Sequence, residues 1–483
     1  MGRKRLRVLF AAAEAYPFAK VGGLADVGSA LPKALVRLGH EVRLVLPGYP
    51  WIERGKSICY LATPLGQSME TVHFSYHGAH QGVKLYTAAN ERYFGREMIY
   101  GYSDDDVRFI LFSKALAAFA AESGWIPDII HANDWHAALV PQYVREGLYR
   151  SVLQQTGMVL TIHNLAYQGP LSPTGEAVIG LEDRFQGNLL ARGIAFADEM
   201  NTVSRRYMEE ILTPEYGAGL DALLRARRDR LRGILNGIDY EEFDPSVDRY
   251  IPARYDASCL QRKQLNKVAL QERSGLVADA EVPLLGMVAR LVDQKGFDLL
   301  CDSLDGIVRL GAQVVVVGVG DARYRQALNR AATDHHGAIA YHLNDGEELA
   351  RLVYAGSDLF LAPSQFEPCG LGPLIALRYG SVPIARRTGG LAETVSDYLE
   401  HPEVGLGFTF VDKYPEHLLR TVNAALDVYR QRERWEELQR RGMGADFAWD
   451  RSAHEYEEMY RDAHRRALGL GQSRELRREH VSA

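Results

Sequence analysis

The stretch Leu284–Gly296 reads LLGMVARLVDQKG, an apolar run that passes directly into a charged loop. A continuous apolar run is typical of a strand that is buried on both faces of a parallel sheet. Arg290 and Lys295 follow the run, so they fall at the carboxyl end of the expected strand. The stretch therefore predicts a buried parallel strand with two cations at its exit.

Runs of the same kind, rich in Val, Leu and Ile, recur along the chain with helical patterns between them. Strands that alternate with helices indicate an α/β, doubly wound architecture. Because ligands of open α/β sheets bind outside the carboxyl ends of the strands, we expect functional residues directly after these runs. The clearest further runs are Leu6–Ala13, Val42–Leu46, Ile129–Ala132, Met158–Ile162, Val314–Val317 and Leu359–Ala362, and the clearest helical stretches are Ala30–Leu38 and Val107–Ala121.

The series of strands runs twice along the chain. The first series ends near Met200, and a polar turn at Asn236–Asp239 separates it from the second. We therefore predict two Rossmann-like domains that face each other across a cleft. Their expected bounds are 1–245 and 246–455, and we expect 456–483 to form a helix and a frayed tail that pack back toward the first domain.

The composition excludes several classes of protein. The chain has 483 residues, of which 47% are hydrophobic, and its formal net charge is −6. An acidic balance argues against a nonspecific nucleic-acid binder or an anionic-membrane binder, since both need an excess of basic residues. No stretch approaches the ~18 apolar residues that span a bilayer. Leu6–Ala13 is better explained as a strand than as a secretory segment, because no cleavage-site pattern follows it.

The cysteines are scattered and form no CxxC pair, which favours reduced thiols in a reducing compartment. We therefore expect a cytoplasmic protein that binds neither nucleic acid nor membrane, and the oligomeric state stays open. The cysteines are Cys59, Cys259, Cys301 and Cys369.

The two cations after the Leu284 run suit one kind of ligand in particular. Arg290 offers a planar fork and Lys295 a point charge, and together they could neutralise a nucleoside diphosphate leaving group without Mg²⁺. A solvated pair flanking a turn has the same spacing. The spacing alone leaves both interpretations open.

The stretch Lys20–Val27 reads KVGGLADV and follows the first expected strand. A Gly-Gly step lets the backbone approach a ligand closely, and the start of a helix attracts anions. The pattern matches neither GxGxxG nor GxxxxGK[ST], so a dinucleotide site or an ATPase has little support. A tight turn with Asp26 near a helix start would look the same.

Polar residues follow two further strands of the first series. His131–His136 reads HANDWH and Thr161–Asn164 reads TIHN. A metal site would need ligands at helical or loop spacings, with further residues that hydrogen-bond to those ligands and orient them. We therefore expect no metal here. Hydrogen bonds from His163 and Asp134 to sugar hydroxyls are the more natural use of these side chains.

Two polar stretches follow strands of the second series. Ser364–Leu371 reads SQFEPCGL and places Glu367 where ligands of the sheet should bind. Arg387–Leu391 reads RTGGL and follows the apolar run Val382–Ala385, so it repeats the order of strand, Gly-Gly and helix.

Taken together, these segments resemble the bacterial glycogen synthase and plant starch synthase family, whose members have the GT-B fold. The matching stretches, in the order of the family, are KVGGLADV, HANDWH, TIHN, ILNGID, ARLVDQKG, FEPCGL and RTGGLAET. They run from Lys20 to Thr394, and DFAWDRSA at Asp446–Ala453 extends the match over nearly the whole chain. Each motif alone is weak, but the ordered set is specific to the family.

The resemblance implies transfer of glucose from ADP-glucose to the nonreducing end of an α-1,4-glucan, with retention and without a cofactor. It implies that Arg290 and Lys295 bind the diphosphate and that Lys20, His163 and Glu367 complete the catalytic set. A retaining double displacement needs two carboxylates ~5 Å apart. Glu367 is the one evident deep carboxylate, so we expect leaving-group departure and acceptor attack on the same face.

The resemblance also implies a set of substrate-binding positions near the phosphates, the donor glucose and the acceptor. These are Glu14, Gly22, Gly23, Asp26, Asp134, Asn164, Asn236, Cys369, Gly370, Leu371, Thr388, Gly389 and Gly390.

Three positions depart from the pattern of the family or of its relatives. Gly372-Pro373 stands where the synthases usually carry Thr-Gln, and Asp345 stands at the position of the Tyr that stacks on adenine. Ile375 replaces a second Glu that holds the ribose in many users of UDP- or GDP-sugars. The alternatives are therefore a GT-B transferase with a UDP-sugar donor, and a noncatalytic glucan-binding relative.

Overall fold

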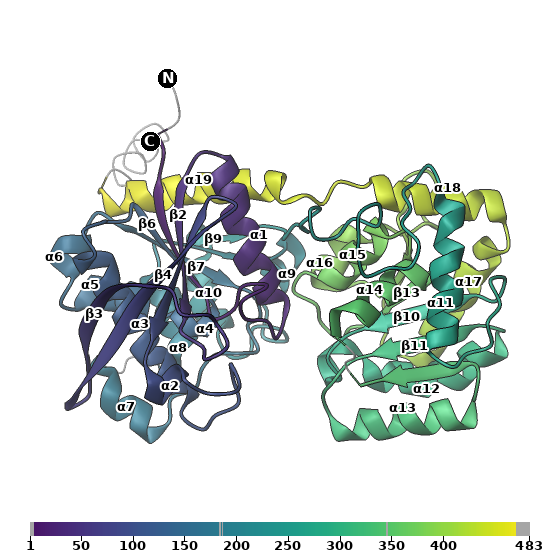
Figure 1. The fold of residues 1–483 in the computed structure, drawn as a ribbon, viewed down its shortest axis with the longest axis horizontal. Coiled ribbons are helices and arrows are strands. Elements are labelled where there is room, and N and C mark those ends of the chain that lie inside the picture. The colour runs from purple at the N-terminus through teal and green to yellow at the C-terminus, as the bar shows by residue number, and fades with distance from the viewer. Residues whose placement is uncertain (1–3, 183–184, 186, 344–345, 470–483) are drawn as a thin grey trace, which may run out of the picture. The chain divides into compact units, whose positions relative to one another are not determined.

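The computed structural model describes residues 4–182, 185, 187–343 and 346–469. The chain forms two compact units, one of Met1–Gly237 with Trp449–Ala483 and the other of Ile238–Ala448. Each unit has a sheet flanked by helices (Figure 1). Both units are doubly wound α/β domains, as the sequence predicts.

The sheet of the first unit has the strand order β3-β4-β5-β2-β1-β6-β7-β8-β9 in the described part of the chain. Its pairs are parallel from β5 through to β9. The strand order reverses between β1 and β6, which is the point where ligands of such sheets bind. The strands are β1 Arg7–Ala11, β2 Glu41–Pro47, β3 Lys56–Leu65, β4 Ser68–His80, β5 Val83–Ala89, β6 Ile129–Asn133, β7 Gly157–Ile162, β8 Glu199–Thr202 and β9 Leu231–Gly233.

One edge of this sheet is antiparallel, which the apolar runs of the sequence do not predict. Strands β3, β4 and β5 form consecutive hairpins. In β3, Leu61, Thr63 and Leu65 are buried, while Ala62 and Pro64 between them face solvent. This alternation is typical of an antiparallel sheet that has one face on the core and the other exposed to solvent. A search for continuous apolar runs therefore passes over it.

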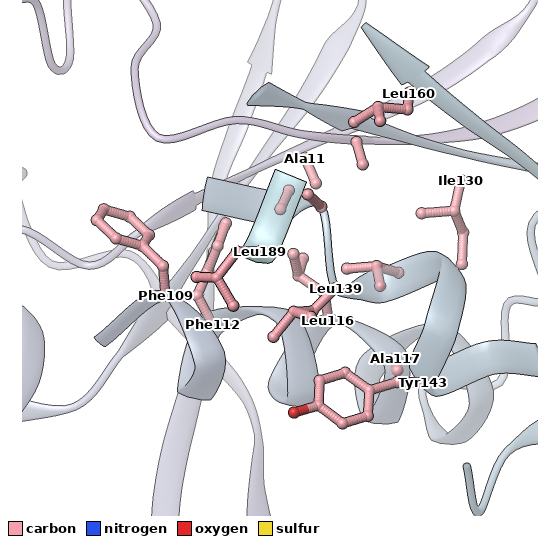
Figure 2. Packing of buried hydrophobic residues seen from close by; sticks show 14 of the residues in the cluster. Ala11, Phe109, Phe112, Leu116, Ala117, Ile130, Leu139, Tyr143, Leu160 and Leu189 are labelled. Atoms are coloured by element: carbon pink, nitrogen blue, oxygen red, sulfur yellow. The ribbon is translucent and has the colours of Figure 1, made fainter. Parts of the chain in front are cut away.

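The helices of the first unit cover both faces of the sheet. One of them, an 18-residue helix, is almost entirely buried. That helix, α3, contains the predicted stretch Val107–Ala121. Figure 2 shows Phe112 and Leu116 of α3 packed near Leu139 and Leu189. The helices are α1 Gly23–Arg37, α2 Glu91–Phe94, α3 Asp105–Glu122, α4 Asp134–Ala137, α5 Val140–Glu146, α6 Arg150–Leu153, α7 Pro173–Ile179, α8 Leu189–Phe196, α9 Arg205–Glu210, α10 Asp221–Ala226 and α19 Trp449–Ala467.

The last helix, α19, belongs to the first unit although it follows the second unit in the sequence. Its apolar side chains share one cluster with Phe10 of β1 and Leu31 of α1. Figure 1 shows α19 in yellow beside the purple and blue N-terminal elements. The cluster takes Trp449, Ala453, Tyr456, Met459, Tyr460 and Ala463 from α19.

A buried chain of hydrogen bonds ties α19 to the sheet. Thr161 Oγ1 donates to Asn201 Oδ1 at 2.7 Å, and His131 Nε2 lies 2.6 Å from Thr161 Oγ1. His131 Nε2 is therefore the donor, and His131 Nδ1 accepts from the Tyr460 hydroxyl at 2.7 Å. Asn201 Nδ2 donates to the Tyr456 hydroxyl at 2.8 Å, so both ends of the chain lie on α19. Burial lowers the pKa of His131 well below its usual value, which agrees with a neutral ring.

The second unit has a six-stranded, fully parallel sheet in the described part of the chain, with the order β12-β11-β10-β13-β14-β15. The order reverses between β10 and β13. The strands are β10 Leu284–Val288, β11 Gln313–Val317, β12 Ile339–His342, β13 Leu359–Ala362, β14 Val382–Arg386 and β15 Phe408–Phe410. The helices are α11 Lys263–Arg273, α12 Phe297–Arg309, α13 Ala322–Asp334, α14 Gly346–Gly356, α15 Leu371–Arg378, α16 Gly389–Thr394, α17 Pro415–Tyr429 and α18 Arg432–Gly444.

None of the helices in the described residues combines the length and the apolar character needed to cross a bilayer.

Replacement of Tyr460 by Phe tests the buried hydrogen-bond chain. The change leaves His131 Nδ1 buried without its donor, so we expect the free energy of unfolding to fall by about 1–3 kcal/mol. Urea unfolding of the full chain measures the difference. Tyr60→Phe is the matched control, because Tyr60 is 65% exposed in the same unit. Equal stability of the two variants would contradict a stabilising role for the chain.

Candidate active site

In the second unit, the loops after β10 and β13 meet at the reversal of strand order. Lys295 ends a short 3-10 helix, Asp293–Lys295, that follows β10. Its Nζ lies 2.6 Å from Glu367 Oε2 on the loop after β13. Ser364 Oγ donates to the same carboxylate oxygen at 2.9 Å, and Glu367 is 7% exposed. Lys295 and Glu367, which the sequence predicts as catalytic, therefore form a partly buried ion pair.

Two glycines allow the loops to approach each other this closely. Gly296 has a φ of 72°, and a Cβ on it would lie 2.0 Å from the Pro363 carbonyl oxygen. A Cβ on Gly390 would lie 2.1 Å from the Cys369 carbonyl oxygen, and its N–H donates to the Glu367 carbonyl at 2.9 Å. Any larger residue would force these loops apart.

Two helices begin beside Glu367. Gly370 is the residue before α15, and Thr388 is the residue before α16, which starts at Gly389. Cys369 is buried, and Leu371 is the first residue of α15. The predicted positions Cys369, Gly370, Leu371, Thr388, Gly389 and Gly390 therefore lie at two helix starts, where backbone N–H groups favour anions.

Arg290 lies on the backbone stretch that leaves β10 and is partly buried. The next residue, Leu291, is fully buried and its N–H donates to the Val319 carbonyl at 2.8 Å. The stretch after β10 is thus fixed against the loop after β11. This fixed backbone gives Arg290 a defined starting point at the carboxyl edge of the sheet.

Two of the three departures from the family pattern, Pro373 and Ile375, lie on helix α15. Pro373 lies in the first turn of α15, where its missing N–H has no intrahelical partner to lose. Ile375 is 6% exposed on the same helix. Asp345 lies outside the described residues.

In the first unit, Glu14 holds the glycine-rich loop that precedes α1. Glu14 Oε2 accepts from the backbone N–H groups of Val21 at 2.5 Å and Gly22 at 2.8 Å. Its other oxygen accepts from the Tyr100 hydroxyl at 2.8 Å. Glu14 is 4% exposed. The family resemblance implies a place for Glu14 near the acceptor, and in this structure its carboxylate binds the loop that leads to Gly23.

Lys20 and Asp26 form an ion pair across the same loop, with Nζ 3.0 Å from Asp26 Oδ1. Lys20 Nζ also lies 5.0 Å from the centre of the Tyr16 ring. The side chains of Lys20 and Asp26 are 34% and 24% exposed. The cation predicted for the phosphates is therefore held on the loop yet reachable from solvent.

Asp134 lies directly after β6 and has a φ of 53°, a conformation that non-glycine residues adopt rarely. Asp134 Oδ1 accepts from the His163 backbone N–H at 2.7 Å, and the Asn164 N–H also bonds to this carboxylate. Burial raises the pKa of Asp134 to about 7 although these N–H groups lower it. The strained backbone thus directs the carboxylate at the loop after β7.

His163 is held by two residues at the end of β6, Asn133 and Asp134. Its ring Nε2 lies 2.9 Å from Asn133 Oδ1, and burial lowers the pKa of His163 to about 3. The ring is therefore neutral, so Nε2 donates to the amide oxygen. Asn164 Oδ1 accepts from the Ala166 N–H at 3.1 Å, which closes the turn after β7.

Asn236 is 4% exposed near the end of the first unit, and its Oδ1 has no hydrogen-bond partner among the described residues. An unpaired buried oxygen is unfavourable unless a ligand or water completes it. A donor hydroxyl of a bound sugar would satisfy this atom.

Two residues that support the site are not predicted from the sequence. Tyr100 donates to Glu14, and its ring stacks on His136 with centroids 4.8 Å apart. Arg386 ends β14, and its Nε donates to the Ser364 carbonyl at 2.7 Å beside Glu367. An arginine at the end of an apolar strand is a signal that could have pointed to Arg386. No local pattern marks Tyr100.

Within the described residues, no group of three or more His, Cys, Asp or Glu side chains is arranged to hold a metal ion. The four cysteines are all free thiols.

Comparisons with known proteins identify the family of this chain. Residues 7–226 match the family described as Starch synthase catalytic domain, and residues 270–441 match Glycosyl transferases group 1. The glycogen synthase of Moorella thermoacetica is 44% identical over 95% of this chain and 97% of its own length. The chain belongs to the glycogen and starch synthase family. The glycogen synthase of Thermotoga maritima is 41% identical over 95% of this chain and 99% of its own length.

Solved structures of related proteins extend the agreement to the fold. The catalytic domain of starch synthase IV from Arabidopsis thaliana, bound to ADP and acarbose, is 34% identical and has a TM-score of 0.90. The match covers 95% of this chain and 100% of that one. Sucrose-phosphate synthase from Thermosynechococcus elongatus, at 19% identity and a TM-score of 0.63, shares the fold alone. As a member of the glycogen and starch synthase family, this chain is a glycosyltransferase with the GT-B fold.

The buried carboxyl of Asp134 gives a prediction for stability against pH. Its pKa is about 7 in the folded chain and about 3.9 in an unfolded one. Between these values the unfolded chain loses the proton first, so native stability falls as the pH rises. Relative to an Asp134→Asn variant, we expect a loss of the order of 1 kcal/mol per pH unit, ending near pH 7.

Urea unfolding of the native chain and the Asp134→Asn variant, at several values between pH 5 and pH 8, measures this slope. Other groups titrate in both proteins, so they cancel in the difference. A difference that stays constant from pH 5 to pH 7 would show that the Asp134 carboxyl ionises normally.

Proposed function

We propose that this chain transfers glucose from ADP-glucose to the nonreducing end of an α-1,4-glucan, with retention of configuration. The observation that carries the proposal is the Lys295–Glu367 ion pair of 2.6 Å at the strand reversal of the second unit. The family supports a nucleotide-sugar donor and a glucan acceptor. The ADP in the similar starch synthase IV structure supports the nucleotide.

The diphosphate is proposed to bind at the carboxyl edge of the second sheet. Arg290 and Lys295 follow β10 and supply fixed positive charge. The starts of α15 and α16 add backbone N–H groups. Charge that develops on the departing diphosphate is stabilised by groups already in place, so little reorganisation is needed in the transition state. Lys20 of the first unit is proposed to contact the phosphates as well.

Glu367 is proposed to orient the donor glucose and to support positive charge on its ring. One carboxylate oxygen already accepts from Lys295 and Ser364, which fixes the plane of the group. A double displacement would need a second carboxylate about 5 Å away. Asp134 and Glu14 are the other buried acids among the predicted residues, and both bind backbone N–H groups. Departure and attack on one face therefore remain the proposed route.

The neutral His163 and the unpaired Oδ1 of Asn236 are proposed to bind donor-glucose hydroxyls. The acceptor is an uncharged polymer, which agrees with a chain whose formal net charge is −6. We further propose that the protein acts in the cytoplasm without a cofactor.

The Glu367→Gln variant tests the role of the carboxylate. Loss of the charge should lower kcat by about 100-fold or more, while the affinity for ADP should change by less than about threefold, because Arg290 and Lys295 remain. The measurements are ADP release during glycogen extension and calorimetric titration with ADP. Glu348→Gln is the matched control, since Glu348 also pairs with a cation in this unit, Arg273, at 2.7 Å. Near-normal turnover of Glu367→Gln would exclude the proposed role.

The preferred nucleotide of the sugar donor is tested by comparing three nucleotide-glucose donors. Incorporation of labelled glucose into glycogen from ADP-, UDP- and GDP-glucose should favour ADP-glucose by at least about tenfold in kcat/KM. The expectation rests on the ADP bound by the similar starch synthase IV, and on Ile375, which replaces the second Glu of many users of UDP- or GDP-sugars. A preference for UDP-glucose would replace the proposed donor. Binding of glycogen without incorporation from any donor would establish a noncatalytic relative.

A further inference from the structure

Trp51 is exposed, whereas the other tryptophans are not. Its exposed fraction is 45%, while Trp125, Trp435 and Trp449 are each at most 8% exposed and Trp135 is partly buried. Trp51 lies in the loop after β2, which belongs to the first unit. Single exposed apolar residues are common on proteins. A large aromatic ring that is both exposed and fixed in place is a different case.

Two contacts fix the Trp51 indole. Its Nε1 donates to the Phe18 carbonyl at 2.8 Å. One face of the ring stacks on Tyr49, with centroids 5.1 Å apart and planes inclined by 8°. Tyr49 is itself 2% exposed, and its hydroxyl donates to the Ala13 carbonyl at 3.0 Å. The indole N–H is therefore satisfied and its inner face is covered, which leaves the outer face toward solvent.

The same contacts attach the ring to the candidate site. Ala13 and Phe18 belong to the segment between β1 and α1, which also carries Glu14 and Lys20. Tyr49 packs with Ala19 of that segment in one small apolar cluster, against which Tyr100 is also packed. The orientation of the indole is thus set by Phe18 of this segment and by Tyr49, which packs against it.

We propose that Trp51, backed by Tyr49, is a stacking platform for a glucose unit of the acceptor glucan. This inference rests on the proposed function, which supplies the glucan. A flat, uncharged aromatic face suits the C–H face of a pyranose ring, because both are apolar and the ring edges remain wet. An indole that is already ordered loses little conformational entropy when the sugar binds. Glu53 and Arg54 follow in the loop and are exposed, so polar partners for sugar hydroxyls are close in sequence.

The test compares Trp51→Ala and Trp51→Phe in the full chain. For Trp51→Ala, KM for glycogen should rise by about tenfold, while KM for ADP-glucose should stay the same. Trp51→Phe loses the hydrogen bond to Phe18 but keeps a ring, so it should retain most of the affinity. Tyr60→Ala is the matched control, because Tyr60 is an exposed ring stacked on His73 at 4.3 Å elsewhere in the same unit.

A second measurement does not depend on turnover. Titration with maltoheptaose should quench the tryptophan fluorescence of the native chain and of Tyr60→Ala, and the quench should be lost in Trp51→Ala. An unchanged KM for glycogen in Trp51→Ala, or an equal rise in Tyr60→Ala, would overturn the platform and leave the proposed function intact. If the native chain extends no glucan with any donor, the proposed function fails, and the fluorescence titration still decides whether Trp51 binds the sugar.

Discussion

The parallel pairing of β10 with β13 is the constraint on which the second unit depends. The register places Leu285 opposite Leu359 and Gly286 opposite Phe360. Both strands therefore end at the same edge, and the loops that follow them are brought together. Lys295 and Glu367 are 72 residues apart in the sequence and reach 2.6 Å through this pairing. The ion pair is thus a product of sheet topology, and Gly296 is required because the loops meet backbone to backbone.

The first unit uses the same topology with different chemistry. Its strand order reverses between β1 and β6, and the loops after these strands carry Glu14 and Asp134. Both carboxylates are buried, and both accept backbone N–H groups of a neighbouring loop. In the second unit the corresponding acid, Glu367, faces a lysine instead. Buried carboxylates therefore shape loops in one unit and carry charge at the candidate site in the other.

The sequence predicts those features that produce a local pattern. The continuous apolar runs correspond to the parallel strands β1, β2, β6, β7, β10, β11, β13 and β14. Polar residues directly after two of them located Lys295 and Glu367 at one place. The hairpin strands β3 and β4 were missed because their buried residues alternate with exposed ones. The bond between Glu14 and the N–H groups of Val21 and Gly22 depends on the turn of the intervening chain, which leaves no mark in residue spacing. Tyr100 is farther still from Glu14 in the sequence, so its contact could only come from the fold.

The fixed geometry of Glu367 bears on the route proposed for the chemistry. A nucleophilic carboxylate must advance on the anomeric carbon and form a covalent bond. Glu367 Oε2 is held by two donors, the Lys295 ammonium and the Ser364 hydroxyl, and the backbone carbonyl of Glu367 accepts from Gly390. Moving this side chain would break a charge-assisted hydrogen bond in a partly buried place, where such bonds are strong. A carboxylate held in this way is suited to stabilise charge from a fixed position. In the proposed site the same lysine pairs with the acid and binds the diphosphate, so one cation links the orientation of the sugar to the binding of its leaving group.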